Sequence, residues 1–89
     1  MNTGNPKHME TRMKPGDIVR HFKGNRYEIL HIALDSETQE ELVVYRALYG
    51  EGRVWVRKKE MFFSPVDRVK YPDVKQTYRF EIVEEAAHE

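Results

Sequence analysis

The fold is decided by residues 42–57, which read LVVYRALYGEGRVWVR. The first half, residues 42–49, is the strongest strand pattern in the chain, because it is rich in β-branched, aliphatic and aromatic residues. Gly50 and Gly52 end this pattern at positions that accept a positive φ. A second strand pattern follows at residues 54–57. The stretch therefore predicts a β-hairpin with a three-residue loop at residues 50–52.

Alternate side chains of such a hairpin point to opposite faces of the sheet. With the loop at residues 50–52, Tyr45 faces Arg57 and Ala47 faces Trp55. One face then carries the rings and guanidinium groups of Tyr45, Tyr49, Arg53, Trp55 and Arg57. The other face carries Arg46 and the aliphatic side chains of Val44, Leu48, Val54 and Val56. A loop longer or shorter by one residue would mix the two sets.

The aliphatic face is the predicted core of the protein. We expect the largely buried residues to be Ile18, Ile29, Val44, Leu48, Val54, Val56 and Phe62. Two interpretations of the aromatic face stay open. Its rings either fill a second small core layer, or they form a ligand surface together with the arginines.

Shorter patterns flank this hairpin on both sides. Strands are expected at residues 18–22, 26–34, 66–69 and 77–83, and single helical turns at residues 36–41 and 58–63. Five or six short antiparallel strands with frequent turn signals predict an all-β fold. A small SH3-like barrel suits the length best, since closing the sheet hides its edges.

Composition excludes several classes of protein. A chain of 89 residues forms one domain, expected here at residues 15–85 between a flexible tail at residues 1–14 and a C-terminal tail at residues 86–89. The absence of cysteine excludes disulfide scaffolds, cysteine-based zinc sites and thiol nucleophiles. No apolar run and no leader pattern predicts a membrane span or a signal peptide, so we expect a cytoplasmic protein.

Charge is balanced in total and segregated along the chain. Fifteen Lys and Arg residues balance fifteen Asp and Glu residues, which disfavours a generic DNA-binding protein. Residues 27–52 nevertheless hold six acidic residues and one basic residue, whereas residues 53–79 hold eight basic and three acidic residues. The basic blocks contain aromatic residues. They are interpreted either as a solvated face or as a patch suited to single-stranded nucleic acid.

Residues 16–63 resemble an uncharacterised bacterial family, domain of unknown function number 1653. The resemblance rests on motifs at Gly16, residues 20–25 (RHFKGN), Tyr27, Glu37-Thr38, residues 43–50 (VVYRALYG), residues 55–57 (WVR) and Met61-Phe62. The chain departs from the family pattern at Lys58, where proline is usual, and in the order of Glu37 and Thr38. The resemblance implies an SH3-like barrel and brings no known activity.

The strands expected at residues 18–22 and 26–34 form a second predicted hairpin, which adds basic and titratable groups to the aromatic face. His21 and Lys23 lie at its turn, and in a closed barrel they are expected near the same cleft as Arg57. A histidine there is either an ordinary strand residue or a hydrogen-bonding and acid–base group. The candidate ligand-binding residues are therefore Arg20, His21, Lys23, Tyr27, Tyr45, Tyr49, Trp55 and Arg57.

No pattern in the chain predicts a catalytic or metal site. No motif marks a nucleophile, no spacing of histidines and carboxylates suits a metal, and the glycines fall in separate turns rather than in a phosphate-binding loop. We expect no cofactor, no metal and no membrane contact. The preferred hypothesis is a non-enzymatic module, monomeric or weakly homodimeric, that holds a peptide, an anionic small molecule or a partner protein. The alternatives are a single-stranded nucleic-acid-binding domain and a small enzyme with a histidine acid–base and an arginine clamp.

Overall fold

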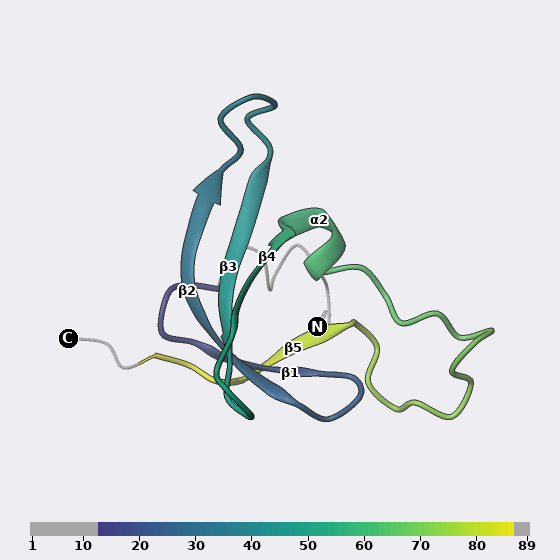
Figure 1. Ribbon diagram of the computed structural model, residues 1–89. Helices are drawn as coiled ribbons and strands as arrows, with labels where there is room; N and C mark the ends of the chain where they lie inside the picture. The colour runs from purple at the N-terminus through teal and green to yellow at the C-terminus, as the bar shows by residue number, and fades with distance from the viewer. Residues whose placement is uncertain (1–12, 87–89) are drawn as a thin grey trace.

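The computed structural model describes residues 13–86 and contains one antiparallel sheet of five strands in the order β4-β3-β2-β1-β5 (Figure 1). A short helix, α2, follows β4. The elements are β1 (Ile18–His21), β2 (Arg26–Leu34), β3 (Glu41–Ala47), β4 (Val54–Lys58), α2 (Lys59–Phe62) and β5 (Phe80–Glu84). The prediction of a mostly-β fold with a helical turn near residue 60 is confirmed. No helix among residues 13–86 is long and apolar enough to cross a membrane.

A β-bulge in β2 explains why its sequence shows no clean alternation. The pairing with β3 shifts between Ile29 and His31, so that Ile29 pairs with Tyr45 and Ile32 pairs with Val43. The extra residue exchanges the two faces of the strand, because side chains alternate with a period of two. Ile29 before the bulge and Ile32 after it therefore both pack on the core.

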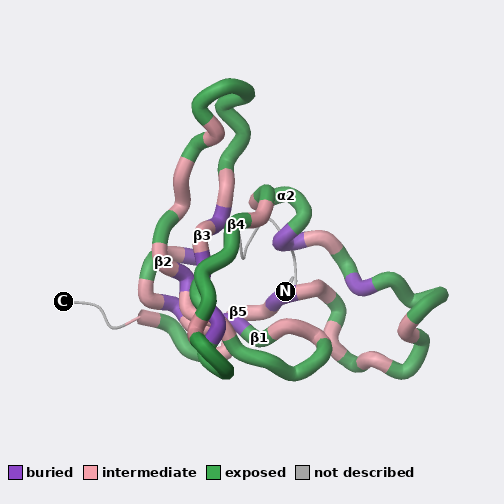
Figure 2. The backbone as a smooth tube through the Cα atoms, in the orientation of Figure 1, coloured by how far each residue is buried: buried purple, intermediate pink, exposed green. Residues whose placement is uncertain are grey.

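Aromatic side chains dominate the core. The Phe62 ring of α2 stacks on the Phe80 ring of β5, with centroids 4.1 Å apart and an interplanar angle of 9°. Tyr45 of β3 packs edge-on against both rings. The buried cluster consists of Met13, Val19, Ile29, Val43, Tyr45, Phe62, Phe63 and Phe80. Figure 2 shows buried backbone at the base of β2 and β3 and exposed backbone at the tip of their hairpin.

The register of the β3–β4 hairpin differs from the predicted one by two residues. Tyr45 pairs with Trp55, and the last hydrogen bond before the loop runs from the Ala47 amide to the Arg53 carbonyl oxygen at 2.9 Å. The connecting loop therefore spans residues 48–52 instead of 50–52. A shift of two residues preserves the faces, so the predicted division into an aromatic and an aliphatic face is correct.

The burial of the two faces is the reverse of the prediction. The side of β3 that bears Val43, Tyr45 and Ala47 is buried, whereas Val54 and Val56 on the other side are 53% and 59% exposed. Leu48 is also exposed, and Ile18 and Val44 are only half-buried. The physical reason is that α2 and β5 pack their phenylalanine rings on the tyrosine side. Of the predicted core residues, Ile29 and Phe62 are confirmed as fully buried.

Three further predictions are corrected. Residues 66–69 form no strand, and only an isolated bridge joins Pro65 to Tyr78. The helical turn expected at residues 36–41 is absent: residues 36–38 form a turn in which the Asp35 carboxylate accepts the amides of Glu37 and Thr38, and Glu41 already belongs to β3. The sheet is not closed, since β4 and β5 are its two edges and are not hydrogen-bonded to each other.

The predicted tails need a separate correction. Residues 1–12 and 87–89 lie outside the described residues. Met13, assigned to the N-terminal tail, is buried in the core at 7% exposure. Ala86, assigned to the C-terminal tail, donates its amide to the carboxylate of Asp17 at 2.7 Å. Met13 and Ala86 therefore take part in the packing and hydrogen bonding of the domain.

Candidate functional site

A basic pocket lies between the turn that joins β1 to β2 and the loop that joins α2 to β5. Its volume is about 250 Å³. It is lined by His21, Phe22, Lys23, Asp67, Lys70, Tyr71 and Arg79. The turn at residues 22–24 forms because Gly24 adopts a φ of 110° and donates its amide to the His21 carbonyl oxygen. The Phe22 amide donates to the Arg79 carbonyl oxygen, which fixes the turn against the segment before β5.

Aromatic rings form one wall of the pocket and hold its two lysines. The rings of Phe22 and Tyr71 meet edge to face, with centroids 5.0 Å apart. The ammonium groups of Lys23 and Lys70 lie 5.5 Å and 5.7 Å from the Tyr71 centroid. Two cations share one ring because its electron-rich face attracts each of them.

The cations of the pocket have no carboxylate partner at ion-pair distance. Lys23, Lys70 and Arg79 form no salt bridge within residues 13–86. Asp67 is the acidic residue of the pocket, and its Oδ1 accepts the amides of Val69 and Lys70. Three cations and one hydrogen-bonded carboxylate therefore leave the pocket electropositive.

His21 is a half-buried residue that lines the basic pocket. Its ring lies 4.4 Å from Phe22 and 4.9 Å from Phe80, and its Nδ1 accepts the Lys23 amide at 3.1 Å. Burial lowers the pKa of His21 to about 4, and the positive charges of Lys23, Arg57 and Arg79 contribute to this shift. The imidazole is consequently neutral at pH 7. Because Nδ1 accepts a hydrogen bond, the ring proton resides on Nε2, which is available as a neutral donor.

A second group, the tyrosine cluster, adjoins His21 and consists of Tyr27, Tyr45, Tyr49 and Arg57. Arg57 lies 5.8 Å from the Phe80 centroid and donates from Nε to the Tyr45 hydroxyl at 3.4 Å. The hydroxyls of Tyr27 and Tyr49 are hydrogen-bonded at 2.8 Å. Burial, followed by this hydrogen bond, raises the pKa of Tyr27 well above its ordinary value. The phenol of Tyr27 therefore stays protonated and is unsuited to acid–base catalysis near neutral pH.

The structure brings together most of the predicted site residues, in two neighbouring groups. His21, Tyr27, Tyr45 and Arg57 all lie against the ring of Phe80, and Tyr49 joins them through Tyr27. Lys23 lines the basic pocket. The predicted proximity of His21 and Arg57 is thus found, although Tyr45 is buried and unavailable as a ligand surface.

Two predicted site residues lie elsewhere. Arg20 is exposed beside β5 and donates to the Gln76 side chain at 3.4 Å. Trp55 is 46% exposed, which shows that it is not a core residue. It lines a separate hollow of about 220 Å³ with Ala47, Tyr49, Gly50, Glu51 and Arg53.

The half of the pocket that the α2–β5 loop provides was not predicted from the sequence. Lys70 was predicted only as part of the basic block of residues 53–79, and Arg79 as part of that block and of the strand expected at residues 77–83. That excess of basic residues was the available signal. It carried no information on which of eight cations would meet the hairpin of β1 and β2.

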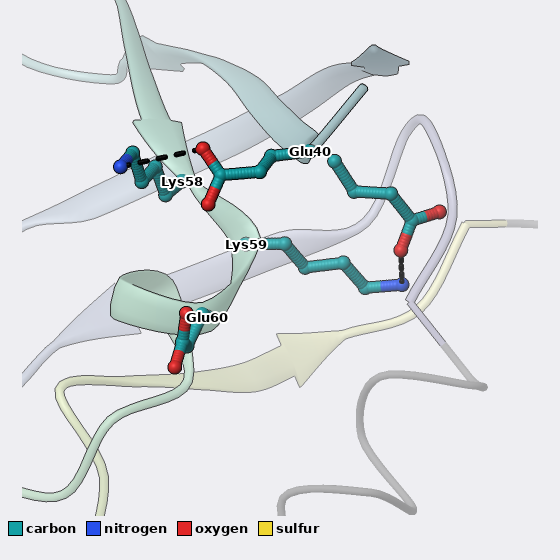
Figure 3. Close-up of a pocket in the computed structure, with 5 residues that line it drawn as sticks. Glu40, Lys58, Lys59 and Glu60 are labelled. Atoms are coloured by element: carbon teal, nitrogen blue, oxygen red, sulfur yellow. Dashed lines mark hydrogen bonds and ion pairs between the residues drawn. The ribbon is translucent and has the colours of Figure 1, made fainter. Parts of the chain in front are cut away.

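A further surface pocket of about 230 Å³ lies where β3 begins and β4 ends (Figure 3). Its charged side chains neutralise one another, because Lys58 pairs with Glu40 at 3.4 Å and Lys59 pairs with Glu41 at 3.1 Å. The Glu60 side chain points away from both pairs (Figure 3). The pocket therefore offers little net charge to a ligand. Within residues 13–86, no group of His, Asp or Glu side chains is arranged to hold a metal ion.

Comparisons with known proteins agree with the fold. A family model described as "Protein of unknown function (DUF1653)" matches residues 17–82. The crystal structure of a DUF1653 protein from Bordetella bronchiseptica superposes with a TM-score of 0.68 at 30% sequence identity, over 89% of this chain and 97% of that chain. No curated protein is detectably similar. The chain belongs to the DUF1653 family, as the motifs of residues 16–63 indicated.

Proposed function

We propose that this member of the DUF1653 family is a non-enzymatic binding module whose basic pocket holds an anionic group of its ligand. The observation that carries the proposal is the convergence of Lys23, Lys70 and Arg79 on one pocket without an ion pair to any carboxylate of residues 13–86. Unpaired cations in a small concave site favour phosphate, sulfate or carboxylate groups. Arg79 supplies a planar fork for two oxygens, and the lysines supply point charges.

The surroundings of the pocket support a role in recognition. Phe22 and Tyr71 add a flat apolar wall, so a ligand with an anionic group on an apolar or planar body suits the pocket better than a free ion. Neutral His21 adds a hydrogen-bond donor to the pocket. An anion beside His21 would raise the pKa of its imidazole, so binding should become tighter as the pH falls from 7 toward 5.

The enzyme alternative receives less support from the same residues. The pKa of His21 is lowered to about 4, which leaves a weak base, and the pKa of Tyr27 is raised. We therefore favour a role in ligand recognition over a role in catalysis.

Titration of the isotope-labelled protein with sulfate, followed by NMR at constant ionic strength, tests the proposal. Sulfate keeps the same charge across the working pH range. Shifts should concentrate at residues 21–23, 67–71 and 79, and Arg79→Gln or Lys70→Gln should weaken binding by about tenfold. Lys75→Gln is the matched control, because Lys75 is an exposed lysine of the same loop that does not line the pocket. Sulfate shifts spread over all exposed cations, or binding unaffected by Arg79→Gln, would contradict the proposal.

The affinity of the protein for a single-stranded oligonucleotide, measured at several salt concentrations, distinguishes the nucleic-acid alternative from the preferred proposal. A strong, sequence-tolerant affinity that falls steeply with salt and is lost in Lys23→Gln would favour that alternative.

We further propose that the open sheet is a variant of an SH3-like barrel, because α2 fills the space between β3 and β5 and Arg57 on β4 reaches Phe80 on β5. The cytoplasm is the proposed compartment, since the chain contains no cysteine.

A further inference from the structure

Strand β4 is an edge of the sheet with an unusual exposed surface. Three consecutive apolar residues on it, Val54, Trp55 and Val56, are 53%, 46% and 59% exposed. Edge strands are normally protected by proline, bulges, very short length or charged side chains, because their free amides and carbonyls pair readily with another strand; β4 has a charged side chain of this kind only at its C-terminal end, in Arg57 and Lys58. The pairing of β4 with β3 contains no bulge, and β4 contains no proline.

The hydrogen bonds of the hairpin fix which backbone groups of β4 are free. The Ala47 amide bonds to the Arg53 carbonyl oxygen, so Arg53 is a residue whose polar groups point toward β3. Antiparallel pairing alternates, and Trp55 and Arg57 therefore also point their backbone groups toward β3. The amides and carbonyls of Val54, Val56 and Lys58 point away from the sheet, toward the free edge.

We propose that β4 pairs with β4 of a second copy of this chain, antiparallel across a two-fold axis at Val56. In this register Val56 pairs with Val56, Val54 pairs with Lys58, and Trp55 lies opposite Arg57 of the second copy. The residues with outward backbone groups then form the hydrogen-bonded pairs that an antiparallel ladder requires. The two sheets join into one continuous sheet, and the same surface serves both copies.

Side-chain complementarity favours a second copy over a different partner. β4 carries two cations, Arg57 and Lys58, and the proposed register places each one opposite an apolar residue instead of another cation. The Lys58 methylene stem covers Val54, and the Arg57 guanidinium lies beside the exposed indole of Trp55. The strand therefore matches itself without an acidic partner. The contact involves one five-residue strand, so the dimer should be weak, with a dissociation constant in the ~micromolar range or above.

Sedimentation velocity of the full chain over a wide concentration range tests the proposal. The wild-type protein should shift from monomer to dimer as its concentration rises. Val56→Glu places two carboxylates against each other at the axis and should weaken the dimer by at least ~tenfold. Val54→Glu places a carboxylate opposite Lys58 of the second copy and should preserve the dimer or tighten it by up to ~fivefold. Val69→Glu is the matched control, because Val69 is 94% exposed in the α2–β5 loop.

A cysteine at the axis gives an independent measurement. The chain contains no cysteine, so Val56→Cys introduces a single thiol. Directly paired strand residues have Cα atoms about 5.5 Å apart, within the range that a disulfide spans. Mild oxidation should therefore link Val56→Cys protein into dimers efficiently and leave Val69→Cys protein mostly monomeric.

The outcomes separate this inference from the proposed function. A protein that stays monomeric at all concentrations, a dimer that survives Val56→Glu, or a dimer that Val54→Glu disrupts as strongly as Val56→Glu would each overturn the inference. Open-ended oligomers that are abolished by Val56→Glu would overturn the two-fold arrangement. Sulfate binding should be unchanged in Val56→Glu, because Val56 does not line the basic pocket.

Discussion

At the residue scale, His21 couples the core to the basic pocket. Its ring contacts Phe80 on the core side and Phe22 on the pocket side, and three cations, Lys23, Arg57 and Arg79, face it. Among residues 13–86, no carboxylate contributes to the shift of its pKa. Protonation of this imidazole is therefore opposed both by burial and by like charge.

This environment predicts how stability depends on pH. The pKa of His21 is about 4 in the folded protein and 6.5 as its ordinary value, so between these limits the unfolded chain binds a proton that the folded chain does not. The contribution of His21 is fully present above pH 6.5 and is lost as the pH falls to about 4. Urea unfolding across this range should show the free energy of unfolding rising with pH.

A matched pair of variants separates the contribution of His21 to the pH dependence of stability from the contributions of other ionisable groups. His21→Asn can keep the acceptor for the Lys23 amide and has no imidazole to titrate, so it should flatten the pH dependence of the free energy of unfolding. His31→Asn, at an exposed histidine of β2, should retain the wild-type slope. Equal slopes in wild type and His21→Asn would refute the assignment.

The reversed faces of the β3–β4 hairpin give a second prediction at this scale. Phe62 is fully buried between Tyr45 and Phe80, and Phe62→Ala should cost about 3 to 5 kcal/mol of unfolding free energy. Leu48 is 47% exposed, and Leu48→Ala should change stability by no more than ~0.5 kcal/mol. Chemical denaturation of both variants measures the difference. Similar losses in both would mean that Leu48 is covered in solution.

At the element scale, two turns differ in the backbone conformation that their glycines adopt. Gly24, in the β1–β2 turn, has a φ of 110°, whereas Gly50, in the β3–β4 loop, has a φ of 58°. A Cβ at either position would meet no atom within 4 Å, so only the backbone distinguishes them. Asparagine adopts a φ near 57° readily and a φ near 110° rarely.

The same substitution should therefore have different effects in the two turns. Gly24→Asn should lower the free energy of unfolding by about 1 to 3 kcal/mol, and Gly50→Asn by less than ~1 kcal/mol. Thermal or urea unfolding measures both. Gly24→Asn should also weaken sulfate binding, since its turn positions His21 and Lys23. A Gly50→Asn variant less stable than Gly24→Asn would contradict this account.

The elements show how far the sequence determines the fold. The positions of the five observed strands, the α2 turn and the division of the β3–β4 hairpin into two faces follow from local patterns, and the structure confirms them, whereas the strand expected at residues 66–69 does not form. Burial does not follow from these patterns, because both faces are apolar. Which of the two faces is buried depends on Phe62 and Phe80, which pack on the tyrosine face from other elements. The β2 bulge likewise arises from pairing with β3 and leaves only irregular alternation in the sequence.

The candidate site likewise consists of residues that the sequence predicts and residues that it does not predict. His21, Lys23, Tyr27 and Arg57 were predictable, since they lie on two hairpins whose turns are evident in the sequence. Lys70 and Tyr71 belong to a segment without regular alternation, and Arg79 lies in the stretch that is expected as a strand at residues 77–83. Their positions depend on long-range contacts such as the bond from the Phe22 amide to the Arg79 carbonyl oxygen. Local patterns do not encode such contacts.

At the scale of the whole molecule, one buried carboxylate joins the two ends of the domain. Asp17 is fully buried just before β1. Its carboxylate accepts the Lys14 amide at 3.0 Å, the Lys14 ammonium at 3.3 Å and the Ala86 amide at 2.7 Å. Its backbone carbonyl also accepts the amide of Ile29 in β2. The sequence around Asp17 does not reveal this role, because the contact with residue 86 is a long-range one.

Loss of this carboxylate should destabilise the whole domain. Asp17→Ala leaves the partly buried amides of Lys14 and Ala86 without acceptors, at a cost of about 1 to 3 kcal/mol for each. Asp35→Ala is a suitable control, since Asp35 also accepts two amides, but in an exposed turn where water can replace it. Its effect should be much smaller. Urea unfolding measures the stability of each variant, and hydrogen exchange at the Ala86 amide reports directly whether its hydrogen bond to Asp17 is present. An Asp17→Ala protein with wild-type stability and a protected Ala86 amide would show that other contacts join the two ends.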